Sequence, residues 1–112
     1  MKKQKEIIAL ARLKNYGRFY HGWIEDNKGN ENAWYLECCL LQQWLRKTHN
    51  LSVVILHFPK YNNKGISKYI EYRYSIIEDN EIWDESERHK SFEEALEEGL
   101  EEALKIVKER SV

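Results

Sequence analysis

The sequence contains few of the residues that interrupt, cross-link or anchor a chain: one proline, five glycines, two cysteines and no long apolar run. So little proline and glycine in 112 residues excludes collagen-like and low-complexity chains. No apolar stretch approaches the roughly 20 residues of a membrane helix. The short apolar run near the amino terminus is interrupted by Arg12 and Lys14 before it could serve as a signal peptide. These absences predict a soluble cytoplasmic protein with no membrane partner.

The two cysteines are adjacent, which excludes a disulfide framework. Cys38 and Cys39 fall on a predicted helix, where successive side chains diverge by about 100° and are poorly placed to bridge each other. We therefore expect buried free thiols in a reducing compartment.

Sequence signatures of catalysis and of cofactor binding are also missing. The chain has no nucleophile elbow, zinc-protease helix, phosphate-binding loop or dinucleotide fingerprint. Its four histidines are scattered over different predicted elements: His21, His49, His57 and His89. A cysteine paired with His49 or His57 is a conceivable nucleophile, but thiols on a core-facing helix are more often inert packing. The sequence predicts no catalytic residue, no metal and no cofactor, and hence a protein that is not an enzyme.

Length and charge predict one domain with two unlike halves. A chain of 112 residues suits a single core, so we expect one domain over residues 1–112, in which residues 1–32 are the hardest to place. Residues 1–50 carry nine basic against five acidic side chains, a net +4, while residues 51–112 carry nine against fourteen, a net −5. Such polarity can mark separate binding faces, although solvated helix faces also produce it.

The segment from Ser91 to Glu109 predicts an amphipathic helix. Ser91 and Glu94 form a capping box, and apolar side chains recur on one stripe. Gly99 lies within this stripe, where it weakens a helix by about 1 kcal/mol relative to alanine. We therefore expect the stripe to pack closely on a sheet.

Two more helices are predicted upstream. Residues 6–14 favour a short helix, and residues 33–49 favour a longer one with Asn32 as the amino-terminal cap and Asn50 as the carboxyl-terminal cap. The aromatic segment 18–24 between them is compatible with a strand or an ordered loop.

The strands are predicted between the second and last helices. Residues 51–58 form a β-branched run that Pro59 should end, and residues 60–66 form a hairpin-type loop. Residues 70–76 alternate apolar with polar side chains, and Ile82 with Trp83 could add a third strand. The prediction is an α+β fold in the order α-α-β-β-(β)-α, in which a two- or three-stranded antiparallel sheet packs against helices.

Two charged regions suggest binding. Six glutamates lie along the last helix, as a solvated face or as an anionic surface for a basic partner; they are Glu93, Glu94, Glu97, Glu98, Glu101 and Glu102. At the other end of the chain is a basic patch that could contact nucleic acid through phosphate pairing; its members are Lys3, Lys5, Arg12, Lys14 and Arg18.

The sheet offers a second kind of surface. Tyr69 and Arg73 fall on the polar face of the second strand, and Trp83 lies among acidic residues in a polar segment. Aromatic and arginine side chains are enriched at protein interfaces. We expect a non-enzymatic accessory or protein-binding module whose partner is another protein or a second copy, bound through the exposed sheet face or through an edge strand that is not covered. Nucleic-acid contact through the basic patch is the alternative.

Two segments also carry a family resemblance. QQWLRKTHNLSVVI, followed by a tyrosine-rich strand and SFEEALEEGLEEALKIV, resembles a group of small uncharacterised proteins encoded in prophages and mobile elements of gut bacteria. The shared features are a W-L-R-x-x-H-N helix end and an F-E-E-A-L-E-x-G-L helix, between Gln42 and Lys108. The resemblance implies a cytoplasmic accessory protein and transfers no functional residue.

Overall fold

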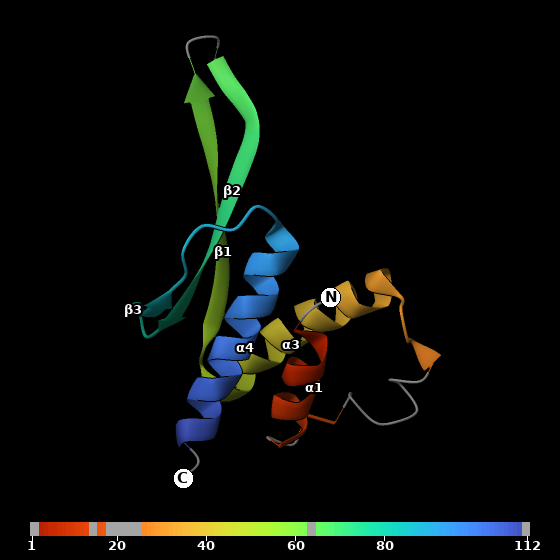
Figure 1. Cartoon of the computed structure of the whole chain (residues 1–112). Helices are drawn as coiled ribbons and strands as arrows, with labels where there is room; N and C mark the ends of the chain where they lie inside the picture. The colour runs from red at the N-terminus through yellow and green to blue at the C-terminus, as the bar shows by residue number, and fades with distance from the viewer. Residues whose placement is uncertain (1–2, 14–15, 18–25, 63–64, 111–112) are drawn as a thin grey trace.

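The computed structural model describes residues 3–13, 16–17, 26–62 and 65–110. Within them the chain forms an α+β fold in the order α1, α3, β1, β2, β3, α4, as predicted (Figure 1). The helices are α1 (Gln4–Leu13), α3 (Glu31–His49) and α4 (Phe92–Arg110). The strands are β1 (Ser52–Asn62), β2 (Gly65–Glu78) and β3 (Glu81–Glu85), so the Ile82–Trp83 segment does join the sheet.

The sheet is an antiparallel meander in the order β1-β2-β3. Asp79 and Asn80 turn the chain between β2 and β3, both with positive φ, which short polar side chains tolerate best. The far half of the β1–β2 hairpin extends past the helices as a two-stranded arm (Figure 1). Ile70 lies toward this arm and is 40% exposed, although the alternation places it on the same face as the buried Tyr74 and Ile76.

Helix α4 organises the core, because it packs on β1, β2, α1 and α3. The Ser91 hydroxyl accepts a 3.1 Å hydrogen bond from the Glu94 N–H, so the predicted start of the helix is confirmed. A Cβ at Gly99 would lie 2.7 Å from Val53 Cγ1 and 3.0 Å from Tyr74 Cβ. The glycine therefore lets the helix approach the sheet, as its position in the apolar stripe predicted.

The caps of α3 confirm one prediction and correct another. Asn50 closes the helix in the left-handed conformation, with φ of 55°. At the other end, however, the cap is Asn30, not Asn32, because Asn30 Oδ1 accepts a 3.1 Å hydrogen bond from the Ala33 N–H. Glu31 and Asn32 are already helical, so the cap nearer the glycine turn prevails.

Strand β1 does not end at Pro59, contrary to the prediction. It continues to Asn62, with a register shift between Pro59 and Tyr61. Proline is tolerated in a strand when its missing N–H would have faced the outer edge. That is the case here, since β1 is an edge strand.

Helix α1 closes the core at the opposite end of the chain. Ile7, Ile8 and Ala11 are buried, and the helix packs on α4. It spans Gln4–Leu13, whereas the predicted range was residues 6–14. Tyr16 is also buried, 5.1 Å from the Trp44 ring. The predicted strand or ordered loop at residues 18–24 lies outside the described residues.

Candidate binding surfaces

The helices cover one face of the sheet and leave the other open. On the open face, five apolar side chains are half-buried or exposed across the three strands: Val54, Leu56, Phe58, Ile77 and Ile82. Leu56 is 39% and Ile82 is 60% exposed. We refer to this side of the sheet, on which these five residues lie, as the open face.

Charged side chains surround Phe58 on this face. The Arg73 and Arg88 guanidinium carbons lie 4.9 Å and 4.6 Å from the centre of the Phe58 ring, within cation–π distance. Arg88 also forms a 3.5 Å ion pair with Glu71 on the neighbouring strand. The open face is therefore apolar at its centre, with a charged group at the end nearest the hairpin arm.

The predicted contact residues do not form one surface. Arg73 belongs to the open face, where it is half-buried against Phe58. Trp83 is 54% exposed, but its ring lies under Arg110 of α4, at 4.9 Å, on the helical side of the sheet. Arg110 is held there by bonds of 2.6 and 2.8 Å to Glu78. The backbone of Tyr69 is part of β2, whereas its side chain lies outside the described residues.

The outer edge of β1 carries backbone groups with no strand beside them in the described sheet. On β2, Tyr74 accepts a backbone hydrogen bond from the segment after β3, so its polar backbone groups point away from β1. Because backbone direction alternates along a strand, Arg73 points toward β1, where it pairs with Leu56. The neighbours of Leu56, namely Ile55 and His57, consequently direct their N–H and C=O groups outward.

The accessible part of this edge is short. Gln42 of α3 donates a side-chain hydrogen bond to the Val53 carbonyl, which covers the edge near the start of β1. Pro59 lacks an N–H and ends the run of donors on the other side. A partner strand would therefore find both donors and acceptors at Ile55 and His57.

Part of the predicted basic patch makes contacts within the fold. Lys3 forms a 3.3 Å ion pair with Glu101 of α4, and Lys5 and Arg12 are exposed on α1. Lys14 and Arg18 lie outside the described residues. Lys3 is thus placed against an acidic helix, which disfavours its use as a phosphate contact.

The glutamate stripe of α4 is not a fully solvated face, contrary to the first interpretation. Glu97 and Glu101 are each only 7% exposed. Glu101 is paired with Lys3 and with Lys105, and the Glu98 carboxylate lies against Nε2 of His89. Part of the anionic surface therefore serves contacts within the chain.

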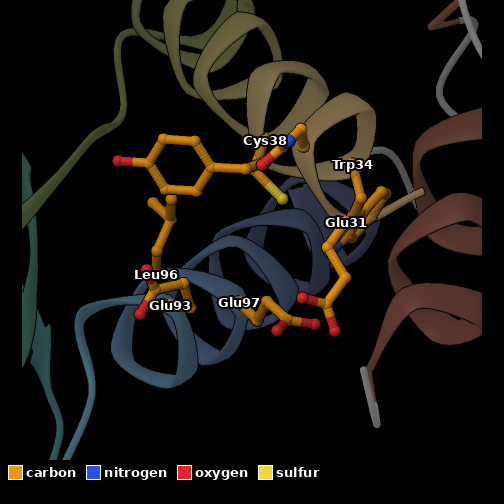
Figure 2. Close-up of a pocket in the computed structure, with 8 residues that line it drawn as sticks. Glu31, Trp34, Cys38, Glu93, Leu96 and Glu97 are labelled. Atoms are coloured by element: carbon orange, nitrogen blue, oxygen red, sulfur yellow. The ribbon is translucent and has the colours of Figure 1, made fainter. Parts of the chain in front are cut away.

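A pocket of about 330 Å³ opens between α3 and α4. Figure 2 shows Glu31 and Trp34 entering from α3 and Glu93 and Glu97 from α4, with the Glu31 and Glu97 side chains pointing toward one another. Glu97 Oε2 is buried and has no hydrogen-bond partner within the described part of the chain.

Desolvation raises the pKa of two groups that line this pocket. Burial raises the pKa of the Glu97 carboxyl, and a hydrogen bond from the Trp34 indole opposes that rise. Burial likewise raises the pKa of the Cys38 thiol, with a further contribution from the charge of Glu97. The Cys38 thiol therefore stays protonated at neutral pH, which disfavours its use as a nucleophile.

Both cysteines are free, with Cys38 buried and Cys39 half-buried. Among the described residues, no group of three or more histidine, cysteine or acidic side chains is arranged to hold a metal ion. None of the described helices has the length and apolar character needed to cross a membrane.

Comparisons with protein-family models, with curated proteins and with solved structures found no match for this chain.

Two features of these surfaces could not be assigned from the sequence. The free edge of β1 depends on strand order, which the strand pattern alone left open. The burial of Glu97 depends on α3 crossing over a stripe that reads as polar. A signal existed only for the second: Glu97 lies one position after Leu96 and three before Leu100, at the border of the apolar stripe.

Proposed function

We propose that this chain is a small non-enzymatic protein-binding module, and that its partner is a second copy of itself paired along β1. The observation that carries the proposal is the exposed edge at Ile55 and His57 beside an uncovered apolar face. Edge strands recruit other strands unless they are covered. The two free cysteines and the resemblance of residues 42–108 to mobile-element proteins support an accessory role in the cytoplasm.

The edge is self-complementary. If two β1 strands run antiparallel with Leu56 opposite its own copy, Ile55 of one chain lies opposite His57 of the other. All four residues then direct their backbone groups across the interface, which permits four hydrogen bonds. Neither Gln42 nor Pro59 lies within this stretch.

The same register matches side chains on the open face. Leu56 meets its copy, and Val54 meets Phe58 from each side, so an apolar stripe continues across the pair. The two three-stranded sheets would join into a single six-stranded sheet, and neither β1 strand would then have a free edge.

A charge swap at the symmetry axis tests this register. Leu56→Glu places two carboxylates opposite each other, and Leu56→Lys places two ammonium groups there, so each variant should dimerise at least about tenfold more weakly. An equimolar mixture of the two should recover dimers, because the opposite charges then face each other. Sedimentation velocity over a concentration series measures all four samples, including the unchanged chain.

Leu36→Glu is the matched control, since Leu36 is 58% exposed on α3, away from the sheet. It should dimerise like the unchanged chain. As an independent probe, His57→Pro removes one outward N–H and should abolish pairing without loss of the monomer fold. A monomeric unchanged chain, or a mixture of the charge variants that stays monomeric, would contradict self-pairing through Leu56.

A further inference from the structure

The pocket between α3 and α4 combines negative charge with aromatic walls. Its carboxyl groups come from Glu31, Glu93 and Glu97, and its rings from Trp34 and Tyr35. Among the residues that the structure describes, no basic side chain lines it. Carboxylates provide charge-assisted acceptors, and aromatic faces attract cations, so both favour a positively charged group.

The Glu97 carboxyl in the wall of this pocket is unusual because it is both acidic and buried. Glu97 is more than nine-tenths buried; hydrogen bonds from the Trp34 indole and from the Lys3 backbone N–H act on its carboxyl group, but its Oε2 has no partner among the described residues. A buried carboxyl oxygen without a donor is unfavourable, and more so when it is charged. A cationic donor in the pocket would satisfy this oxygen and offset the desolvation that raises the pKa of Glu97.

The shape of the pocket narrows the class of cation. Its volume of about 330 Å³ exceeds the need of a bare ion, and the described acidic groups are not arranged as a metal site. Leu96 adds an apolar wall, which suits an alkyl chain attached to the charged head.

We propose that this pocket binds an alkylammonium group, with Glu97 and Glu31 around the charged head and with Trp34, Tyr35 and Leu96 around the alkyl stem. The group can belong to a lysine side chain of a protein or to a free diamine. The pocket lies between helices on the covered side of the sheet, so its use is independent of pairing through β1.

Titration followed by ¹⁵N NMR of the full chain tests the proposal. n-Butylammonium should give saturable shifts of the Trp34 indole signal and of backbone amides in residues 93–97. n-Butanol, which has the same alkyl chain without the charge, should give none. Trp34→Phe assigns the indole signal.

Removing single charges identifies the carboxyl groups that bind the alkylammonium head. Glu97→Gln and Glu31→Gln should each weaken binding, by about tenfold for Glu97, and Glu102→Gln should leave it unchanged because Glu102 lies outside the pocket. Glu31 is exposed in the first turn of α3, so its variant keeps the test valid even if Glu97→Gln alters the core. No saturable shift, equal binding of n-butanol, or unchanged affinity in both pocket variants would overturn the proposal.

Two further probes distinguish the sources of the group. Tighter binding of N-acetyl-lysine N-methylamide than of 1,5-diaminopentane supports a lysine side chain of a partner protein. The opposite order supports a free diamine.

Discussion

At the residue scale, Gly99 determines how closely α4 approaches the sheet. Alanine would improve helix propensity by about 1 kcal/mol. Its Cβ, however, would lie 2.7 Å from Val53 Cγ1 and 3.0 Å from Tyr74 Cβ, and the second atom cannot rotate away. We expect overpacking to outweigh propensity, so that Gly99→Ala lowers the free energy of unfolding by about 1–2 kcal/mol. Urea denaturation followed by circular dichroism measures the change.

Gly17→Ala is the control for this substitution, because no atom of the described residues, the adjacent ones aside, lies within 4 Å of a Cβ at Gly17. It should change stability little. If Gly99→Ala proves as stable as the unchanged chain, the helix does not depend on close contact with Val53 and Tyr74.

Glu97 makes the stability depend on pH. Its folded pKa lies above the ordinary value of 4.5 because burial disfavours the carboxylate. The folded state therefore holds this proton more tightly than the unfolded state does. The contribution of this raised pKa to the free energy of unfolding is fully present below about pH 4.5. It is lost as the pH rises through the folded pKa of Glu97. We expect Glu97→Gln to unfold at a higher urea concentration than the unchanged chain at pH 7, and this gain should shrink toward pH 4.

Glu102→Gln controls for the loss of one negative charge on α4, since Glu102 is partly exposed and 3.2 Å from Lys105. It should show no gain that grows with pH. A Glu97→Gln variant that is less stable than the unchanged chain at pH 7 would show that the carboxylate is favourable where it lies. Higher stability together with weaker alkylammonium binding would separate the binding role of Glu97 from a merely structural one.

Residue patterns predicted some of these positions and missed others for a physical reason. The role of Gly99 could be predicted, because a small residue inside an apolar stripe needs a close neighbour. The burial of Glu97 could not, because helical periodicity shows which side of α4 is apolar but not how far α3 extends over its border. Side chains at such borders are assigned by tertiary packing.

At the element scale, the sequence predicted the type and order of the described helices and strands, since these depend on local periodicity, and it left open whether the sheet has two or three strands. The boundaries were less certain where two residues could serve the same role. Asn30 and Asn32 both suit a helix cap, and it is the Asn30 side chain that accepts the hydrogen bond from the Ala33 N–H. Pro59 interrupts a strand only when its nitrogen faces a neighbouring strand. The local residue pattern does not give the strand order, so it could not show that this nitrogen faces the free edge.

The same limit applies to the candidate surfaces. The alternation in β2 correctly placed Arg73 and Tyr74 on opposite faces, but it could not show that helices cover only one of them. Trp83 was predicted as a contact residue from its polar surroundings. In the folded chain, it packs under Arg110 at the end of α4 while remaining half exposed. Exposure and pairing are properties of the assembled elements, which is why the β1 edge became visible only with the sheet.

At the scale of the whole molecule, the opposite charges of the two halves meet inside the fold. Helix α1 from the basic half packs on α4 from the acidic half, where Lys3 lies against Glu101. Asn50 at the end of α3 also donates a 2.9 Å hydrogen bond to Asp79 in the second half. One basic group of the first half is thus used for a contact with the second half, which disfavours Lys3 as a phosphate contact in the alternative of a nucleic-acid surface.

This interlocking makes α1 part of the core, so its removal should unfold the protein. Ile7 and Ala11 are fully buried and Ile8 nearly so. Full burial of one isoleucine contributes about 1.5–3 kcal/mol, and a typical domain is stable by only about 5–15 kcal/mol. We expect a chain lacking residues 1–13 to lose cooperative thermal unfolding by circular dichroism.

The double variant Lys3→Ala with Lys5→Ala is the control, because it removes two positive charges but no buried apolar group. It should unfold cooperatively near the temperature of the unchanged chain. A truncated chain that still unfolds cooperatively would show that α3, α4 and the sheet form a complete domain, with α1 as an attached helix.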